Sequence, residues 1–246
     1  MKLMYKPLSY FLIILVLLAA CQAKAVTENA AGSTAKKYSE LTDKKPITLA
    51  APKRIKPLDV PLINQMDPPR LYNGCEVSSL AMVLNYHGIK VSKNELAEKI
   101  DRVPLAYGNG LKGNPNDGFV GNMEDGPGLA VYHGPVKKLA EQYAGGKTAD
   151  ITGEPIDVLY KYLTEGMPVW VITTVNSVPV NDWEAWETPS GIVEVTYSVH
   201  SVVMTGFDED YVYINNPYGQ KNQKVDKQGF EKAWKQMGSQ AIVIER

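Results

Sequence analysis

The chain is built around one stretch, Tyr72-Asn73-Gly74-Cys75-Glu76-Val77-Ser78-Ser79-Leu80-Ala81-Met82-Val83-Leu84-Asn85-Tyr86-His87-Gly88. Apolar residues recur in it at the i, i+3, i+4 and i+7 positions that share one face of a helix, from Val77 to Leu84. Gly74 precedes this run and Gly88 follows it, where a glycine allows the left-handed backbone that ends many helices. The stretch therefore predicts a buried helix with Cys75 in its first turn.

The position of Cys75 bears on its chemistry. The unpaired N–H groups and the positive dipole end at a helix N-terminus stabilise an anion, so we expect the thiol to shift toward the nucleophilic thiolate. Free cysteines are also common as small buried packing residues. The position alone leaves both interpretations open.

The N-terminus has the pattern of an export signal. Lys2 and Lys6 precede an apolar stretch from Tyr10 to Ala20, which is shorter than the ~20 residues of a membrane span. It ends in Leu18-Ala19-Ala20-Cys21, which resembles the lipobox of bacterial lipoproteins. The resemblance implies that residues 1–21 are a lipoprotein signal peptide with Cys21 lipidated, and that the protein is anchored at the outer face of the cell membrane. Ordinary secretory cleavage and an uncleaved short anchor are the alternatives.

The number of cysteines sharpens the question about Cys75. The chain has two, Cys21 and Cys75, so a lipidated Cys21 leaves Cys75 without a disulfide partner. An unpaired thiol in an exported protein meets an oxidising compartment, which favours a functional residue over a packing one.

Composition sets the class of protein. The length of 246 residues suits one domain with an extension, and the net charge of −1 gives no reason to expect a polyanionic partner. No basic run interleaved with aromatics indicates nucleic-acid binding, and no paired His, Cys or Asp spacing indicates a metal site, so we expect no cofactor. Residues 22–56 are predicted to be a flexible polar tether, and residues 57–246 a single domain.

Helical patterns come before most of the strand patterns, which predicts an α+β fold with N-terminal helices packed on a C-terminal antiparallel sheet. Two long stretches, 101–128 and 176–190, are predicted to be loops, and a capping box starts at Ser92. Beyond the Cys75 helix, the expected helices are 96–100, 135–143, 153–165 and 228–237. The expected strands are 55–65, 150–151, 168–174, 192–197, 200–207, 211–215 and 241–244.

A thiolate enzyme needs a base, and three histidines are available. His87 lies at the far end of the Cys75 helix, ~18 Å away at about 1.5 Å per residue. His133 precedes a helix and is interpreted as a surface or packing residue. His200 opens a strand and can point into a cleft, although a histidine there is often structural.

Two further residues complete a candidate site. The turn at residues 208–210 joins two antiparallel strands, which brings His200 and Asn216 to the same edge. An amide there can fix the imidazole tautomer, whereas Asn216-Pro217 as plain turn chemistry is the alternative. Gln65 is a candidate amide donor to an oxyanion near the Cys75 N–H.

These residues together resemble the papain-like cysteine peptidases of family thirty-nine, the bacteriocin double-glycine peptidase type. The resemblance spans roughly Val60 to Ile244 and is strongest with exported single-domain bacterial relatives. Many relatives have Asp where Asn216 stands, and the founding members act inside the cell fused to a transporter. The motifs are Gln65, Gly74-Cys75-Glu76, Ser79-Leu80-Ala81-Met82, Tyr86-His87-Gly88, Gly118-Phe119-Val120-Gly121-Asn122, Trp183 to Trp186, His200 and Asn216-Pro217.

The resemblance implies a papain-like cysteine peptidase fold and assigns four catalytic roles. Cys75 is the nucleophile, His200 the base, Asn216 the group that orients the base, and Gln65 an oxyanion donor. The expected protein is a monomeric, lipid-anchored cysteine peptidase acting on a peptide or protein substrate. Two alternatives stay open: a cell-wall peptide amidase or acyltransferase with the same site, and a non-catalytic lipoprotein that binds peptides.

Overall fold

The structure is a computed structural model that describes residues 55–246. The predicted signal peptide, Cys21 and the tether as far as residue 54 lie outside the described residues. The end of the predicted tether is part of the domain, because the N–H of Ile55 donates to the carbonyl of Phe207 at 3.1 Å. No helix within residues 55–246 is long and apolar enough to cross a membrane.

A six-stranded sheet forms the centre of the domain, and every pair of neighbouring strands in it is antiparallel. The strand order is β3-β10-β4-β7-β8-β9. This arrangement confirms the predicted α+β class with an antiparallel sheet. The strands are β3 (Thr148–Asp150), β4 (Val169–Thr174), β7 (Val199–Phe207), β8 (Tyr211–Asn216), β9 (Gln220–Asp226) and β10 (Ala241–Ile244).

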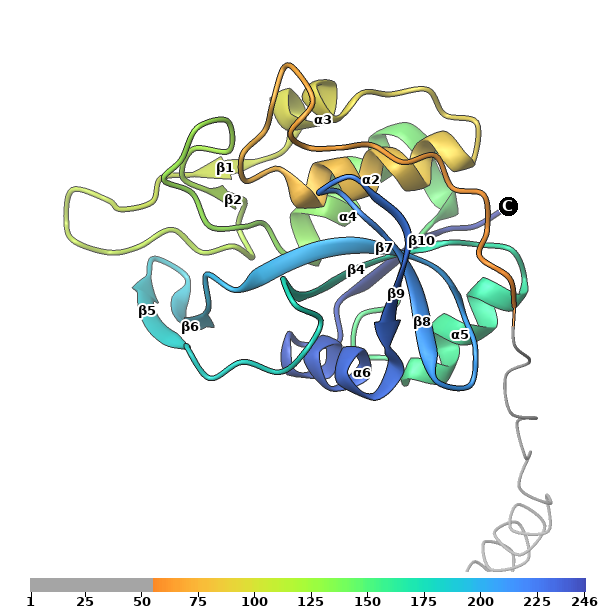
Figure 1. The fold of residues 1–246 in the computed structure, drawn as a ribbon. Coiled ribbons are helices and arrows are strands. Elements are labelled where there is room, and N and C mark those ends of the chain that lie inside the picture. The colour runs from red at the N-terminus through yellow and green to blue at the C-terminus, as the bar shows by residue number, and fades with distance from the viewer. Residues whose placement is uncertain (1–54) are drawn as a thin grey trace, which may run out of the picture. The chain divides into compact units, whose positions relative to one another are not determined.

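Helices cover both faces of this sheet (Figure 1). Helices α2 (Cys75–Tyr86) and α4 (His133–Ala144) pack on one face, and α3 (Lys93–Lys99) packs against α2. Helices α5 (Ile156–Thr164) and α6 (Lys227–Gln236) pack on the other face. Residues of β4, β7 and β10 alternate between the two apolar cores, so these central strands are buried on both faces. A short 3-10 turn, η1 (Gly145–Lys147), links α4 to β3.

Helix α2 matches the predicted element and is buried more completely than its pattern requires. All its residues from Cys75 to Leu84 are buried, which is typical of a helix enclosed by the protein on every side. Gly88 ends the helical segment with a φ of +80°, as predicted. Position 74 requires glycine for lack of space, because a Cβ there would lie 2.4 Å from the Cβ of Leu71. The chain therefore turns tightly just before Cys75.

Three sequence predictions were wrong. Residues 55–65 are extended without forming a strand, because Pro57 and Pro61 have no N–H to donate to a ladder. The predicted loop 176–190 contains β5 (Glu184–Thr188), which forms a hairpin with β6 (Gly191–Val195). The predicted loop 101–128 contains the short parallel pair β1 (Arg102–Val103) and β2 (Phe119–Val120).

Candidate active site

Cys75 is the first residue of α2, with Gly74 at the N-cap. The residue is only 7% exposed, and among the described residues its thiol forms no disulfide. The thiol sulfur accepts a hydrogen bond from the backbone N–H of Ser201, the residue after His200. The fold therefore places the helix start of Cys75 against the strand that carries His200.

The charge state of Cys75 differs from the sequence prediction. Burial raises the pKa of the thiol well above its usual range, and the neighbouring Glu76 carboxyl raises it further. The N–H groups of Ser201 and of Cys75 itself lower the pKa, but by less than burial raises it. The expected shift toward thiolate is thus wrong for the resting state, because tertiary packing removes the solvent that a helix terminus alone would keep.

His200 lies at the start of β7 and is 1% exposed. Its Nε2 lies 2.9 Å from Oδ1 of Asn216 at the end of β8, so the structure brings these two residues together as the strand order predicted. Since Oδ1 can only accept, Nε2 carries the hydrogen and Nδ1 is left as the basic nitrogen. Burial lowers the pKa of His200 to about 4, while the bond to Asn216 raises it slightly, so the imidazole is neutral at pH 7.

Asn216 is held by more bonds than an orienting role requires. Its Oδ1 also accepts from the backbone N–H of Tyr218 at 3.0 Å. Its Nδ2 donates to the side-chain oxygens of Gln220 at 3.1 Å and Gln223 at 2.8 Å. Asn216 therefore contacts both His200 and the turn that follows β8, which is compatible with either interpretation of Asn216-Pro217.

Tyr218 was not predicted as a site residue. Its ring stacks on the His200 imidazole with centroids 4.8 Å apart and planes 10° from parallel. Burial raises the pKa of its phenol most, and the nearby Cys75, Tyr72 and Glu76 raise it further. Because Tyr218 is 47% exposed, its ring covers the histidine from the solvent side. An aromatic residue two positions after Asn216 was the signal in the sequence.

Gln65 lies against the segment that leads into Cys75. Its Nε2 donates to the carbonyls of Tyr72 at 2.9 Å and Leu71 at 3.3 Å, so both amide hydrogens have partners. Its backbone N–H donates to the Pro217 carbonyl at 2.8 Å. Gln65 thus ties the turn after β8 to the entry of α2, and an oxyanion would have to displace one of its two bonds, of which the Leu71 bond is longer.

Glu76 belongs to the Gly74-Cys75-Glu76 motif, and its side chain lies in an unusual environment. The residue is 0% exposed, and its Oε1 accepts from the backbone N–H of Val131 at 3.1 Å. Within the described residues Oε2 has no hydrogen-bond partner, and the Cys75 thiol interacts with the carboxyl group. Burial raises the pKa of this carboxyl to about 7.

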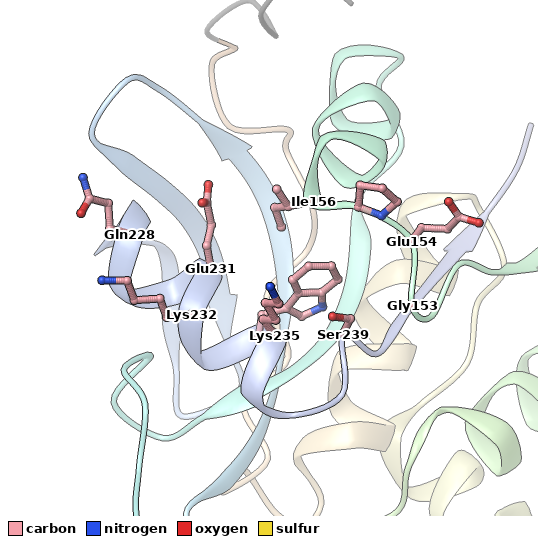
Figure 2. Close-up of a pocket in the computed structure, with 10 residues that line it drawn as sticks. Gly153, Glu154, Ile156, Gln228, Glu231, Lys232, Lys235 and Ser239 are labelled. Atoms are coloured by element: carbon pink, nitrogen blue, oxygen red, sulfur yellow. The ribbon is translucent and has the colours of Figure 1, made fainter.

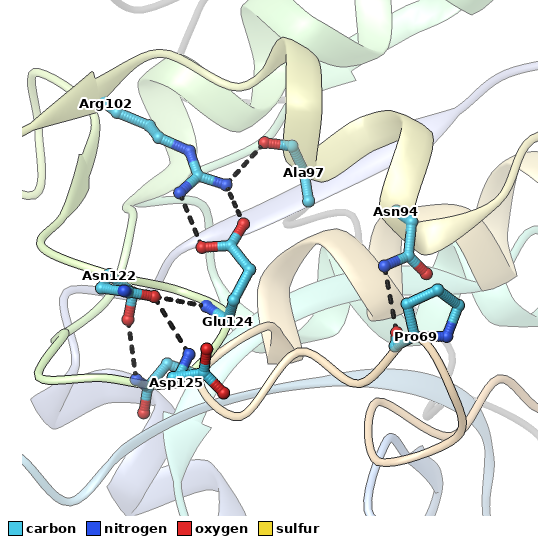
Figure 3. Close-up of polar contacts among 8 residues, drawn as sticks. Pro69, Asn94, Ala97, Arg102, Asn122, Glu124 and Asp125 are labelled. Atoms are coloured by element: carbon cyan, nitrogen blue, oxygen red, sulfur yellow. Dashed lines mark hydrogen bonds and ion pairs between the residues drawn. The ribbon is translucent and has the colours of Figure 1, made fainter.

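The loop between α3 and α4 braces the approach to Cys75. The backbone N–H of Asn73 donates to the Met123 carbonyl at 2.8 Å, and its side chain donates to the Asn122 carbonyl at 3.0 Å. Figure 3 shows how Arg102 binds both carboxylate oxygens of Glu124, at 2.6 and 3.0 Å, and so holds this loop in place. Asn122, the last residue of the 118–122 motif, therefore contacts the segment that leads into Cys75.

The remaining histidines have other surroundings than His200. His133 begins α4 and its Nδ1 lies 2.7 Å from the Asp150 carboxylate. It lines a cavity of about 300 Å³ together with Tyr132 and Trp183. His87 is the C-cap of α2, at the far end of the helix from Cys75. This position agrees with the prediction that His87 cannot reach the thiol.

A larger cavity lies elsewhere in the described part of the chain. It has a volume of about 570 Å³ and lies between the start of α5 and helix α6 (Figure 2). None of Cys75, His200 and Asn216 lines it. Within residues 55–246 no cluster of His, Cys, Asp or Glu could hold a metal ion.

Sequence and structure comparisons agree with this architecture. Residues 57–242 match the model of the Peptidase_C39 like family. The uncharacterized protein YvpB of Bacillus subtilis (strain 168) is 62% identical over 191 residues, which is 78% of this chain and 76% of that protein. A crystal structure from Bacillus anthracis, assigned to the C39-like peptidases, is 43% identical, has a TM-score of 0.74, and covers 78% of this chain and 98% of its own.

The antiparallel sheet with helices on both faces is the fold of a C39-like peptidase. The chain belongs to the Peptidase_C39 like family. A double glycine motif protease from an AMS/PCAT transporter, solved with its leader peptide, is 19% identical with a TM-score of 0.41, and covers 79% of this chain and 94% of its own.

Proposed function

We propose that this protein is a cysteine peptidase that hydrolyses peptide bonds through Cys75, His200 and Asn216. One observation carries the proposal: His200 Nε2 is paired with Asn216 at 2.9 Å, on the strand whose next N–H binds the Cys75 sulfur. A neutral imidazole in this tautomer has Nδ1 free to accept a proton.

In the proposed reaction His200 acts as a general base at the moment of attack. The Cys75 thiol gives its proton to Nδ1 of His200 as the sulfur bonds to the substrate carbonyl carbon. The imidazolium then gives that proton to the leaving amine as the peptide bond breaks, which leaves a thioester on Cys75. Water, deprotonated by the same nitrogen, releases the acid and restores the thiol.

The oxyanion would be stabilised at the start of α2. The Cys75 N–H lies among the first N–H groups of the helix, which have no partner within it. We propose that Gln65 adds a second donor when it exchanges its 3.3 Å bond to Leu71 for the oxyanion. We also propose that the mature protein is anchored through Cys21 at the outer face of the membrane, which would direct it to extracytoplasmic peptides.

The experiment that tests this function uses a peptide mixture and the purified full chain. Wild-type protein should generate new peptide ends, and Cys75→Ala should generate none. Running the reaction in water carrying a heavy oxygen isotope separates a peptidase from an acyltransferase, because only hydrolysis puts the label into the new carboxyl group. Absence of cleavage by wild-type protein on both ordinary peptides and cell-wall stem peptides would favour a binding protein instead.

A further inference from the structure

The Glu76 carboxyl is buried beside the nucleophile and has no part in the steps above. It follows Cys75 in the first turn of α2 and is fully enclosed. One oxygen accepts from the Val131 N–H at 3.1 Å, and Oε2 has no hydrogen-bond partner among the described residues. The Cys75 thiol interacts with the same carboxyl group. The backbone of Glu76 is fixed as well, because Trp170 Nε1 on β4 donates to its carbonyl at 3.0 Å. The side chain therefore cannot move away to solvent.

The surroundings of this carboxyl contain no positive charge. The titratable groups that face it are the Cys75 thiol on its own helix, Tyr132 before α4 and Tyr218 after β8. His200 on β7 is neutral and pairs with Asn216. None of the ion pairs among the described residues includes Glu76. A buried carboxylate without a cation is costly, so this group favours its protonated form.

We infer that Glu76 and Cys75 share one proton and that the carboxyl group controls the nucleophile. While Glu76 is charged, the thiol keeps its proton and donates it to the carboxylate oxygen. When the proton lies on Oε2, the O–H donates to a thiolate sulfur and stabilises it. The two states contain the same atoms and the same number of protons, and only the position of the proton differs.

This inference rests on the proposed function for its biological meaning, but its chemistry can be measured without peptide cleavage. Two coupled groups lose their protons in two steps that belong to the pair. The alkylation rate of Cys75, which follows the thiolate fraction, should therefore rise in two steps with pH in the wild-type protein. The pKa of about 7 for Glu76 places the first step near neutral pH.

The decisive variant is Glu76→Gln. Its amide oxygen can still accept from Val131, and its NH₂ group can donate to the sulfur, so it imitates the protonated acid permanently. The alkylation profile should become a single step with a midpoint lower by about one unit or more, and alkylation near pH 8 should be about tenfold faster. The matched control is Glu98→Gln on α3, which removes an equal charge from an exposed side chain and should leave the profile unchanged.

The measurement is the iodoacetamide rate at the Cys75 peptide, followed by mass spectrometry on the full chain between pH 5 and pH 10. A Glu76→Gln profile that coincides with wild type, or moves to higher pH, overturns the inference. If that variant does not fold, a single-step wild-type profile overturns it as well. If wild-type protein cleaves peptides through Cys75 but the wild-type and Glu76→Gln alkylation profiles coincide, the inference fails and the proposed function stands. If the alkylation profiles differ as expected but no peptide is cleaved, the proposed function fails and the inference stands.

Discussion

The sharpest prediction concerns the pairing of His200 with Asn216. It compares two variants, Asn216→Ala and Asn216→Asp. Asn216→Ala leaves the buried Nε2–H of His200 and the N–H of Tyr218 without an acceptor. Each such loss costs about 1–3 kcal/mol, so the free energy of unfolding should fall by roughly 2–6 kcal/mol. The lost contacts to Gln220 and Gln223 should add little, because exposed or part-buried amides regain bonds to water.

Turnover should fall much further than stability explains. Without Asn216 the tautomer of His200 is no longer fixed, and Nδ1 is no longer reliably the basic nitrogen. A misplaced general base costs about 10²- to 10⁴-fold in rate, so turnover per folded active site should fall by at least about 10²-fold.

Asn216→Asp should keep most of the activity. A carboxylate accepts the same bonds from His200 and Tyr218, and rotation of the Gln220 and Gln223 amides would turn their NH₂ groups toward it. The new negative charge should raise the pKa of His200 from about 4 by about 1–3 units. The acid limb of the pH–rate profile should then move up by the same amount.

The assays are urea unfolding for stability and turnover normalised to titrated Cys75 for activity. Imidazole titration by NMR on a His87→Gln, His133→Gln background follows the pKa of His200 alone. Unchanged normalised turnover in Asn216→Ala would refute the orienting role and leave Asn216 as a turn residue. An unchanged pKa of His200 in Asn216→Asp would refute the direct pairing.

Three other predictions concern Gln65, Tyr218 and Cys21. Gln65→Ala should lower kcat by about 10- to 10²-fold with little change in KM if the amide stabilises an oxyanion, whereas a fall in Tm alone would assign it to bracing the loop before α2. Tyr218→Leu should raise the pKa of His200 by letting water reach the ring and should lower kcat/KM, and Tyr218→Phe, which keeps the stacked ring, should behave as wild type in the same titration. Cys21→Ala should move the protein from the membrane fraction to the soluble fraction on cell fractionation, and a wild-type protein that is already soluble would contradict the proposed anchor.

Local patterns predicted the elements that position the site. The helical spacing from Val77 to Leu84 and the glycines around it predicted α2 closely, and β-prone runs predicted β4, β7 and β10. The encounter of His200 with Asn216 followed from two strands and the short turn between them. Such features are determined by residues close together in the sequence, so they can be read before the fold is known.

The errors arose where tertiary packing decides the outcome. Strand β9 is polar, Gln220-Lys221-Asn222-Gln223-Lys224-Val225-Asp226, and it was not predicted because an edge strand can form without an apolar alternation. The pKa of Cys75 had the opposite direction from the prediction, because the helix terminus is visible in the sequence but its burial is not. Tyr218 was missed for the same reason, since its stacking depends on the turn closed by Gly219, with a φ of +96°.

The most direct test of the central claim is the trapping of a covalent intermediate on Cys75. A peptide ester acylates a thiol faster than water releases it, so rapid acid quenching during turnover should preserve a thioester. Intact mass and peptide mapping should then find the acyl group of the substrate on Cys75 in wild-type protein, and His200→Ala should accumulate it far more slowly. Cleavage of the peptide ester with no acyl group on Cys75, or an undiminished rate in Cys75→Ala, would contradict the account.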